Sequence, residues 1–120
     1  MSVNSGGDPS SAPAGLEDTA RRAASMNGEP SPRNIEYVIT GRYALSRTDG
    51  SRPAADDPTY FVQMTGDFVN YYARTPRGSK APRGTVLTVM VDVATGRMLG
   101  QSLGSAPHDL SRLGTVRTLP

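Results

Sequence analysis

The stretch between residues 84 and 103 constrains the fold most, because its pattern predicts a β-hairpin. Thr85 to Val91 is dominated by β-branched residues, which pack well on the pleated surface of a sheet. A turn-forming segment follows, and Gly96 is its expected pivot because a short hairpin loop commonly needs one residue with positive φ. Asp92 and Thr95 can hydrogen-bond to nearby backbone amides and so hold the turn.

A second strand pattern runs from Thr59 to Tyr72. It places Tyr60, Val62 and Met64 on one face of a sheet. Gly66 interrupts the pattern, and a glycine inside a strand often marks a bulge or bend. Two short strands and one long bent strand both fit this stretch.

The segment before it allows two interpretations. In residues 34–39, Ile35, Tyr37 and Ile39 occupy alternate positions, which predicts a first strand or an extended lead-in. Thr40 can then cap a short helix over residues 41–47, although a continuous strand over residues 36–45 fits nearly as well. The sequence leaves this choice open.

Residues 16–26 predict a short helix, with acidic residues in its first turn and Asn27-Gly28 as its stop. Because alanines dominate its apolar stripe, a docked helix and a transient one fit equally well. Residues 1–15 are rich in Ser, Gly and Pro and cannot bury enough apolar area to offset backbone ordering. This stretch is predicted to be a disordered tail.

Length and composition allow one small α+β domain. The 120 residues include 36% hydrophobic residues, 13 glycines and 10 prolines, so the core is expected to be small. We predict an antiparallel sheet of three to five strands with one short helix, preceded by a disordered N-terminal arm. The expected division is an arm at 1–33, disordered or partly helical, a domain at 34–104 and a C-terminal tail at 105–120 that Leu110 and Leu113 fasten to the sheet edge. Most of the core should come from Tyr60, Val62, Met64, Phe68, Val86, Val89, Val91 and Leu99.

Charge and residue usage exclude several classes of protein. There is no cysteine, so disulfides and thiolate metal sites are excluded. The net charge of +2, carried almost wholly by arginine, falls short of a nucleic-acid-binding signature. No apolar run reaches ten residues, so we expect no membrane span and no signal-peptide core. On the sequence as given the protein is expected in the cytoplasm, or exported or membrane-attached if an N-terminal segment is missing.

The order helix, strand, strand, hairpin and the motif Val91-Asp-Val-Ala-Thr-Gly-Arg-Met-Leu99 resemble PepSY-like domains. These are small α+β modules whose last hairpin carries a similar Val-Asp-x-x-Thr-Gly-x-x-Leu pattern. The chain is also similar, over residues 42–104, to small uncharacterised proteins of high-GC bacteria, in which a strand ending Gly66-Asp-Phe68 precedes a loop like residues 76–84. The similarity to the uncharacterised proteins implies an exported or membrane-attached protein. The resemblance to PepSY-like domains implies a module that restrains a peptidase or senses the cell envelope, and it assigns no binding residue.

The segment Gly100-Gln-Ser-Leu-Gly104 matches the Gly-x-Ser-x-Gly nucleophile-elbow pattern, with His108 and Asp109 close behind. An elbow needs a strand that turns sharply into a helix, whereas Pro107 follows here and no helix can start. His108 and Asp109 are adjacent, which does not suit the relay of a catalytic triad. We therefore expect these glycines to end a strand and assign no catalytic residue.

Metal and acid-base chemistry are also poorly supported. His108 is the only histidine, so a metal site would need several carboxylates around it. Asp56 and Asp57 are adjacent and point apart on an extended chain. Asp67 and Asp92 would form a carboxylate pair only if strands aligned them, and Asp92 has a sufficient role in the turn. No metal site and no cofactor are predicted.

The basic loop over residues 73–83 is the strongest binding candidate in the sequence. It carries a cation about every third residue and follows two tyrosines. The candidate binding residues are Tyr71, Tyr72, Arg74, Arg77, Lys80 and Arg83. Cations beside aromatic rings can hold phosphates while the rings stack on bases, which favours a single-stranded nucleic acid or an anionic polymer. A solvated loop is the simpler interpretation, because exposed cations usually contribute little.

The leading functional hypothesis is a non-enzymatic binding or regulatory module that contacts a protein partner or a cell-envelope component. A basic-loop binder of nucleic acid or anionic polymer is the first alternative, and a small hydrolase is the second. Edge strands of a small open sheet can also pair between copies, so a homodimer through a sheet edge is a further expectation.

Overall fold

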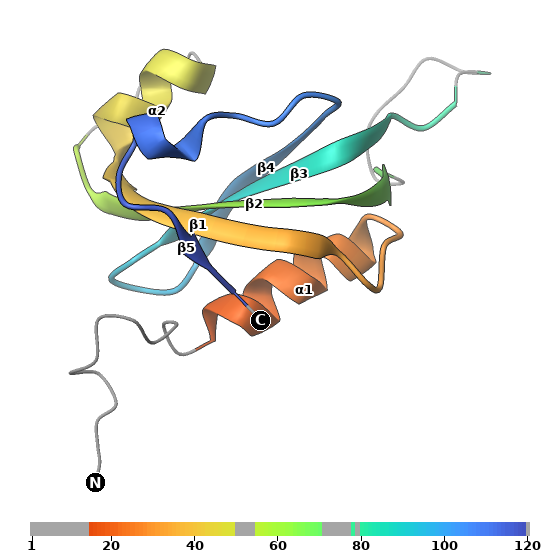
Figure 1. Ribbon diagram of the computed structural model, residues 1–120, viewed down its shortest axis with the longest axis horizontal. Helices are drawn as coiled ribbons and strands as arrows, with labels where there is room; N and C mark the ends of the chain where they lie inside the picture. The colour runs from red at the N-terminus through yellow and green to blue at the C-terminus, as the bar shows by residue number, and fades with distance from the viewer. Residues whose placement is uncertain (1–14, 50–54, 71–77, 79, 120) are drawn as a thin grey trace, which may run out of the picture.

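The computed structural model describes residues 15–49, 55–70, 78 and 80–119. Five strands form one antiparallel sheet in the order β4-β3-β2-β1-β5 (Figure 1). In chain order the elements are α1 (Leu16–Met26), β1 (Arg33–Gly41), α2 (Arg42–Asp49), β2 (Pro58–Val69), β3 (Arg83–Asp92), β4 (Met98–Gly104), the 3-10 helix η2 (Leu110–Arg112) and β5 (Arg117–Thr118). The predicted α+β class, a small antiparallel sheet with a short helix across it, is confirmed. Of the tail predicted at residues 1–15, residues 1–14 lie outside the described residues.

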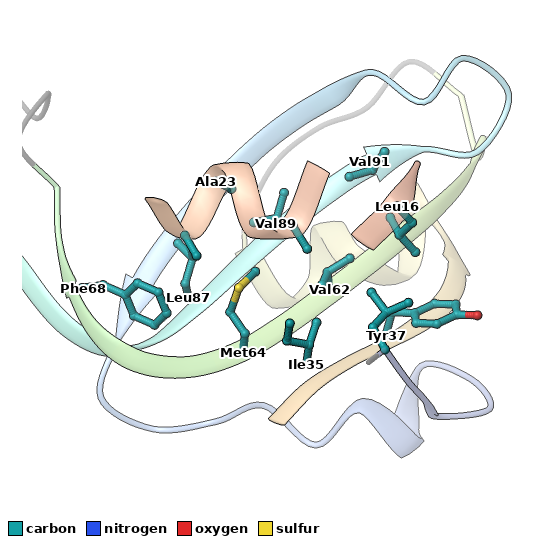
Figure 2. Packing of buried hydrophobic residues seen from close by; sticks show 13 residues of the cluster. Leu16, Ala23, Ile35, Tyr37, Val62, Met64, Phe68, Leu87, Val89 and Val91 are labelled. Carbon is teal, nitrogen blue, oxygen red and sulfur yellow. The ribbon is translucent and has the colours of Figure 1, made fainter. Parts of the chain in front are cut away.

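α1 lies across one face of the sheet, which we call the helix face (Figures 1 and 2). Leu16, Ala20, Ala23 and Ala24 are its buried residues, and the small alanine side chains let the helix approach the strands closely. They pack on a cluster from the strands and from Leu119, which follows β5; the strand residues are Ile35, Tyr37, Val62, Met64, Phe68, Leu87, Val89 and Val91. The predicted helix is therefore confirmed with both of its boundaries, and it is docked.

The predicted β-hairpin is also confirmed. β3 and β4 pair antiparallel, and Gly96 in the turn between them has a φ of 72°. The Asp92 carboxylate accepts hydrogen bonds from the Thr95 amide at 2.9 Å and the Thr95 hydroxyl at 2.8 Å. These bonds, aided by the nearby Arg42 guanidinium, hold the pKa of Asp92 below its ordinary value.

Replacing Gly96 by alanine should isolate the cost of the positive φ. A Cβ at Gly96 would have no atom within 4 Å, so Gly96→Ala adds no steric clash. We expect it to lower the free energy of unfolding by about 1–2 kcal/mol, the cost of a left-handed conformation for a residue with a Cβ. Gly104→Ala is the matched control, because the space there is equally open and φ is not positive. Equal losses for the two variants in urea unfolding would contradict this account.

β2 is one long strand that bends at Gly66. Its pairing with β3 shifts register between Thr65 and Phe68, so the bent-strand alternative is the one observed. A Cβ at Gly66 would overlap the side chain of Glu29. The carboxylate of Glu29 accepts a hydrogen bond from the Asp67 amide at 3.0 Å, and this bond is the main cause that lowers the pKa of Glu29.

The alternatives for residues 36–47 resolve into a strand followed by a helix. β1 ends at Gly41 and α2 begins at Arg42. Thr40 does not act as the expected cap, because it stays in β1 opposite Thr59. Asp56 takes that role instead, since its Oδ1 accepts a hydrogen bond from the Tyr43 amide at 2.9 Å.

Most of the predicted core residues are buried. Val62, Met64, Phe68, Val86, Val89 and Val91 are all 7% exposed or less. Leu99 is a wrong prediction, because it is 39% exposed at the irregular start of the edge strand β4. Tyr60 is only partly buried, and its ring meets the Tyr37 ring edge-to-face at 5.9 Å between centroids. Burial raises the pKa of Tyr60.

The chain after β4 crosses the other face of the sheet, which we call the opposite face, and returns to the β1 edge (Figure 1). Leu110 is buried there with Val38, Leu45 and Phe61, and Leu113 packs against this cluster. Leu110 therefore fastens the tail to a face of the sheet, and the predicted edge contact is made instead by β5, which pairs with β1. Residues of α1 and of this C-terminal segment thus belong to the same packed unit as the strands.

Candidate functional site

A pocket of about 310 Å³ lies on the opposite face. It is bounded by β2, β3, β4, α2 and the crossing segment, by which we mean residues 105–109. Its lining residues are Leu45, Phe61, Thr88, Met90, Gln101, Ser102 and His108. This volume is at the small end of the range of about 300–1,000 Å³ that is typical of ligand pockets.

The floor of the pocket is apolar and well supported. Leu45 is 2% exposed and Phe61 is 5% exposed, and both belong to the buried cluster on this face. Met90 is partly buried and packs against the same cluster. The Phe61 ring also meets the His108 ring edge-to-face, with 5.7 Å between centroids.

The polar lining residues are Thr88, Gln101, Ser102 and His108, and two of them contribute a pair of hydroxyl groups. Thr88 on β3 lies directly opposite Ser102 on β4, so their side chains share a face. Their hydroxyl oxygens are 2.7 Å apart, and either one can be the donor. Thr88 is buried while Ser102 is exposed, so it is the Ser102 oxygen that solvent or a ligand can reach.

Gln63 fixes the crossing segment above the pocket. Its side chain is 6% exposed. Its Oε1 accepts a hydrogen bond from the His108 amide at 2.8 Å, and its Nε2 donates to the His108 carbonyl at 3.2 Å. The side-chain amide therefore pairs with the His108 backbone as a neighbouring strand would. Sequence reasoning missed this contact, because its two partners are 45 residues apart.

The structure brings Ser102 and His108 to the same pocket but turns Asp109 to another partner. The Asp109 carboxylate accepts hydrogen bonds from the Ser111 amide and hydroxyl, and these lower the pKa of Asp109. Ser102 lies within β4, so the sharp strand-to-helix turn of a nucleophile elbow is not formed around it.

The described acidic residues do not converge on a site. Asp67 lies beside the first residue of β3, with its Oδ1 4.0 Å from the Arg83 Nη1, whereas Asp92 ends the same strand. These two carboxylates are therefore separated by the length of β3 and form no pair. Among residues 15–49, 55–70, 78 and 80–119 there is no group of three or more His, Asp or Glu side chains placed to hold a metal ion.

The basic-loop candidates are only partly described. Tyr71, Tyr72, Arg74 and Arg77 lie outside the described residues. Lys80 and Arg83 are exposed, and Arg83 makes the long contact with Asp67.

β4 forms one edge of the described sheet. Its seven residues, Met98 to Gly104, include no charged residue and no proline. Met98 is 42% exposed and Leu99 is 39% exposed. Natural proteins usually protect an edge strand with charges, prolines or a covering element. β4 lacks the first two and carries only an irregularity near Met98.

Comparison with protein-family models, curated proteins and solved structures finds no match to this chain. In the described part of the chain, no helix has both the length and the hydropathy that crossing a bilayer requires.

Proposed function

We propose that this chain is a non-enzymatic protein-binding module that captures an extended segment of a partner protein on the edge of β4. The observation that carries the proposal is the charge-free, proline-free edge strand. An extended segment that pairs with this strand gains main-chain hydrogen bonds along the edge, while the alternating side chains decide specificity.

The edge is held in place before a partner arrives. Asn27, which is 1% exposed at the end of α1, exchanges two side-chain hydrogen bonds with Gln101 of β4, at 3.0 and 3.2 Å. The Asn27 carbonyl also accepts a hydrogen bond from the Val69 amide at 2.7 Å. Because α1 braces β4 in this way, less ordering entropy is lost on binding.

The resemblance of the Val91–Leu99 hairpin to PepSY-like domains agrees with a regulatory role. On that resemblance the partner is a peptidase or another cell-envelope protein. The two described cations of the basic loop, Lys80 and Arg83, do not form a site with any other described residue beyond the contact to Asp67. The proposal therefore rests on the edge and not on the loop.

A charge placed on the edge should abolish the interaction. We expect Leu99→Lys to reduce the recovered partner at least about tenfold in pull-downs from host lysate and envelope fractions, because a lysine protects an edge against pairing. Val116→Lys is the matched control. Val116 is also an exposed apolar residue, at 37%, and it directly precedes β5 at the other edge of the described sheet. The pull-downs are run at about 100 mM and about 500 mM salt, which separates screened charge contacts from apolar ones.

Three outcomes would overturn the proposal. A partner that Leu99→Lys still retains would not use the edge. Nucleic acid or anionic polymer recovered only at low salt would favour the basic loop. A dimer in gel filtration that Leu99→Lys converts to a monomer, without any other captured protein, would assign the edge to a second copy of the chain.

A further inference from the structure

We propose that the pocket on the opposite face binds a small uncharged molecule with an aromatic or branched aliphatic body and one hydroxyl or carbonyl group. This site lies on the opposite face beside β4, whose Gln101 and Ser102 line it, and it goes beyond the proposed protein-binding function. It is argued from the charge, the rigidity and the polar pattern of the lining.

The lining selects against ions. None of the seven described lining residues is Lys, Arg, Asp or Glu. The His108 imidazole is the one ionisable side chain among these lining residues. A phosphate, carboxylate or ammonium group that enters the pocket therefore loses its water without gaining a Lys, Arg, Asp or Glu partner, and this desolvation is costly. An uncharged molecule avoids that cost and gains contact with the apolar floor.

The floor of the pocket and its wall at His108 are formed before a ligand binds. Leu45 and Phe61 are fixed within the buried cluster that also holds Val38 and Leu110. The His108 backbone is held by both hydrogen bonds of Gln63. Because these walls are preorganised, a small ligand does not have to order them, which favours binding at this modest volume.

The hydroxyl pair supplies one polar anchor for the ligand. If Thr88 donates to Ser102, the Ser102 proton is free to bind a ligand oxygen. If Ser102 donates to Thr88, its oxygen still accepts a bond from a ligand hydroxyl. Gly100 and Gly104 flank Ser102 on the same face of β4, and a Cβ at Gly104 would have no atom within 4 Å, so this flank is open.

The charge preference can be measured with three probes that share one ring system. Naphthalenemethanol is uncharged, naphthoate is an anion and naphthylmethylamine is a cation at neutral pH. We expect naphthalenemethanol to shift the amide NMR signals of the lining residues with a dissociation constant below about 1 mM, and the two ions to bind at least about tenfold more weakly. No shifts at the lining residues, or equal binding of the three probes, would overturn the proposal.

Filling the pocket should remove the site. Ser102→Leu places a bulky side chain at an exposed position of the pocket, so we expect naphthalenemethanol binding to fall at least about tenfold. Thr85→Leu is the matched control, because Thr85 is an exposed strand residue that does not line the pocket. Ser102→Ala keeps the fold and the apolar contacts, and it should weaken binding about fivefold by removing one hydrogen bond.

Undiminished binding in both Ser102 variants would place the probe elsewhere and overturn the proposal. The edge variant Leu99→Lys should bind naphthalenemethanol as the unmodified chain does, because Leu99 does not line the pocket. The pocket and the edge of β4 are therefore tested independently of each other.

Discussion

Phe68→Ala is expected to lower the free energy of unfolding by about 3–5 kcal/mol, the range for removing a buried phenylalanine ring. Phe68 is 0% exposed and is one of the largest fully buried side chains of the described structure. It lies just after the bend of β2 and packs in the helix-face cluster (Figure 2). Its loss would leave a cavity next to Gly66, whose own tight packing limits how far the backbone can relax.

The only other phenylalanine, Phe61, provides the matched control. It is 5% exposed on the opposite face of the sheet, and its ring already borders the pocket. Phe61→Ala therefore extends an existing space and should cost at least about 1 kcal/mol less than Phe68→Ala, because fewer packing contacts are lost. Urea unfolding followed by circular dichroism gives both values, and equal losses would contradict the packing difference.

A loss of this size matters for a small domain. Typical domains are stable by only about 5–15 kcal/mol, and small cores are at the lower end. We therefore expect Phe68→Ala to populate the unfolded state measurably without denaturant, while Phe61→Ala remains folded.

The parts of the fold that follow local rules could be predicted from the sequence. Asp92, Thr95 and Gly96 specify the hairpin turn through short-range bonds and a positive φ. Gly66 marks the bend of β2, because a glycine that interrupts a strand pattern is visible in the sequence. Each of these signals depends on residues only a few positions apart.

The parts that depend on distant partners could not be predicted in the same way. Asp56 caps α2 across a loop, and Leu99 is exposed at the irregular start of the edge strand β4. The pocket likewise needs residues from three strands, one helix and the crossing segment at once. Its polar residue Ser102 belongs to the Gly-x-Ser-x-Gly pattern, but the pattern alone gives no information about the apolar floor beneath it.

The interaction between Gln63 and His108 is the clearest case of such a distant contact, and its removal is the second large effect we expect. Gln63→Met keeps most of the side-chain length but removes both hydrogen bonds to the His108 backbone. Two bonds of about 0.5–1.5 kcal/mol each predict a loss of about 1–3 kcal/mol in the free energy of unfolding.

The larger consequence of Gln63→Met is local. Without the Gln63 amide, the His108 ring still meets Phe61 and Leu110 still anchors the chain after the crossing segment, but the His108 backbone loses both hydrogen bonds to Gln63. Amide exchange at His108 should therefore accelerate at least about tenfold, beyond the change at the fully buried Val89. The pocket would lose one fixed wall, and naphthalenemethanol binding should weaken with it. Gln101→Met is the control for the exchange measurement, because it removes the amide bonds to Asn27 on the helix face and leaves the Gln63 contact intact. If exchange at His108 accelerates equally in both variants, Gln63 has no specific role in holding the crossing segment.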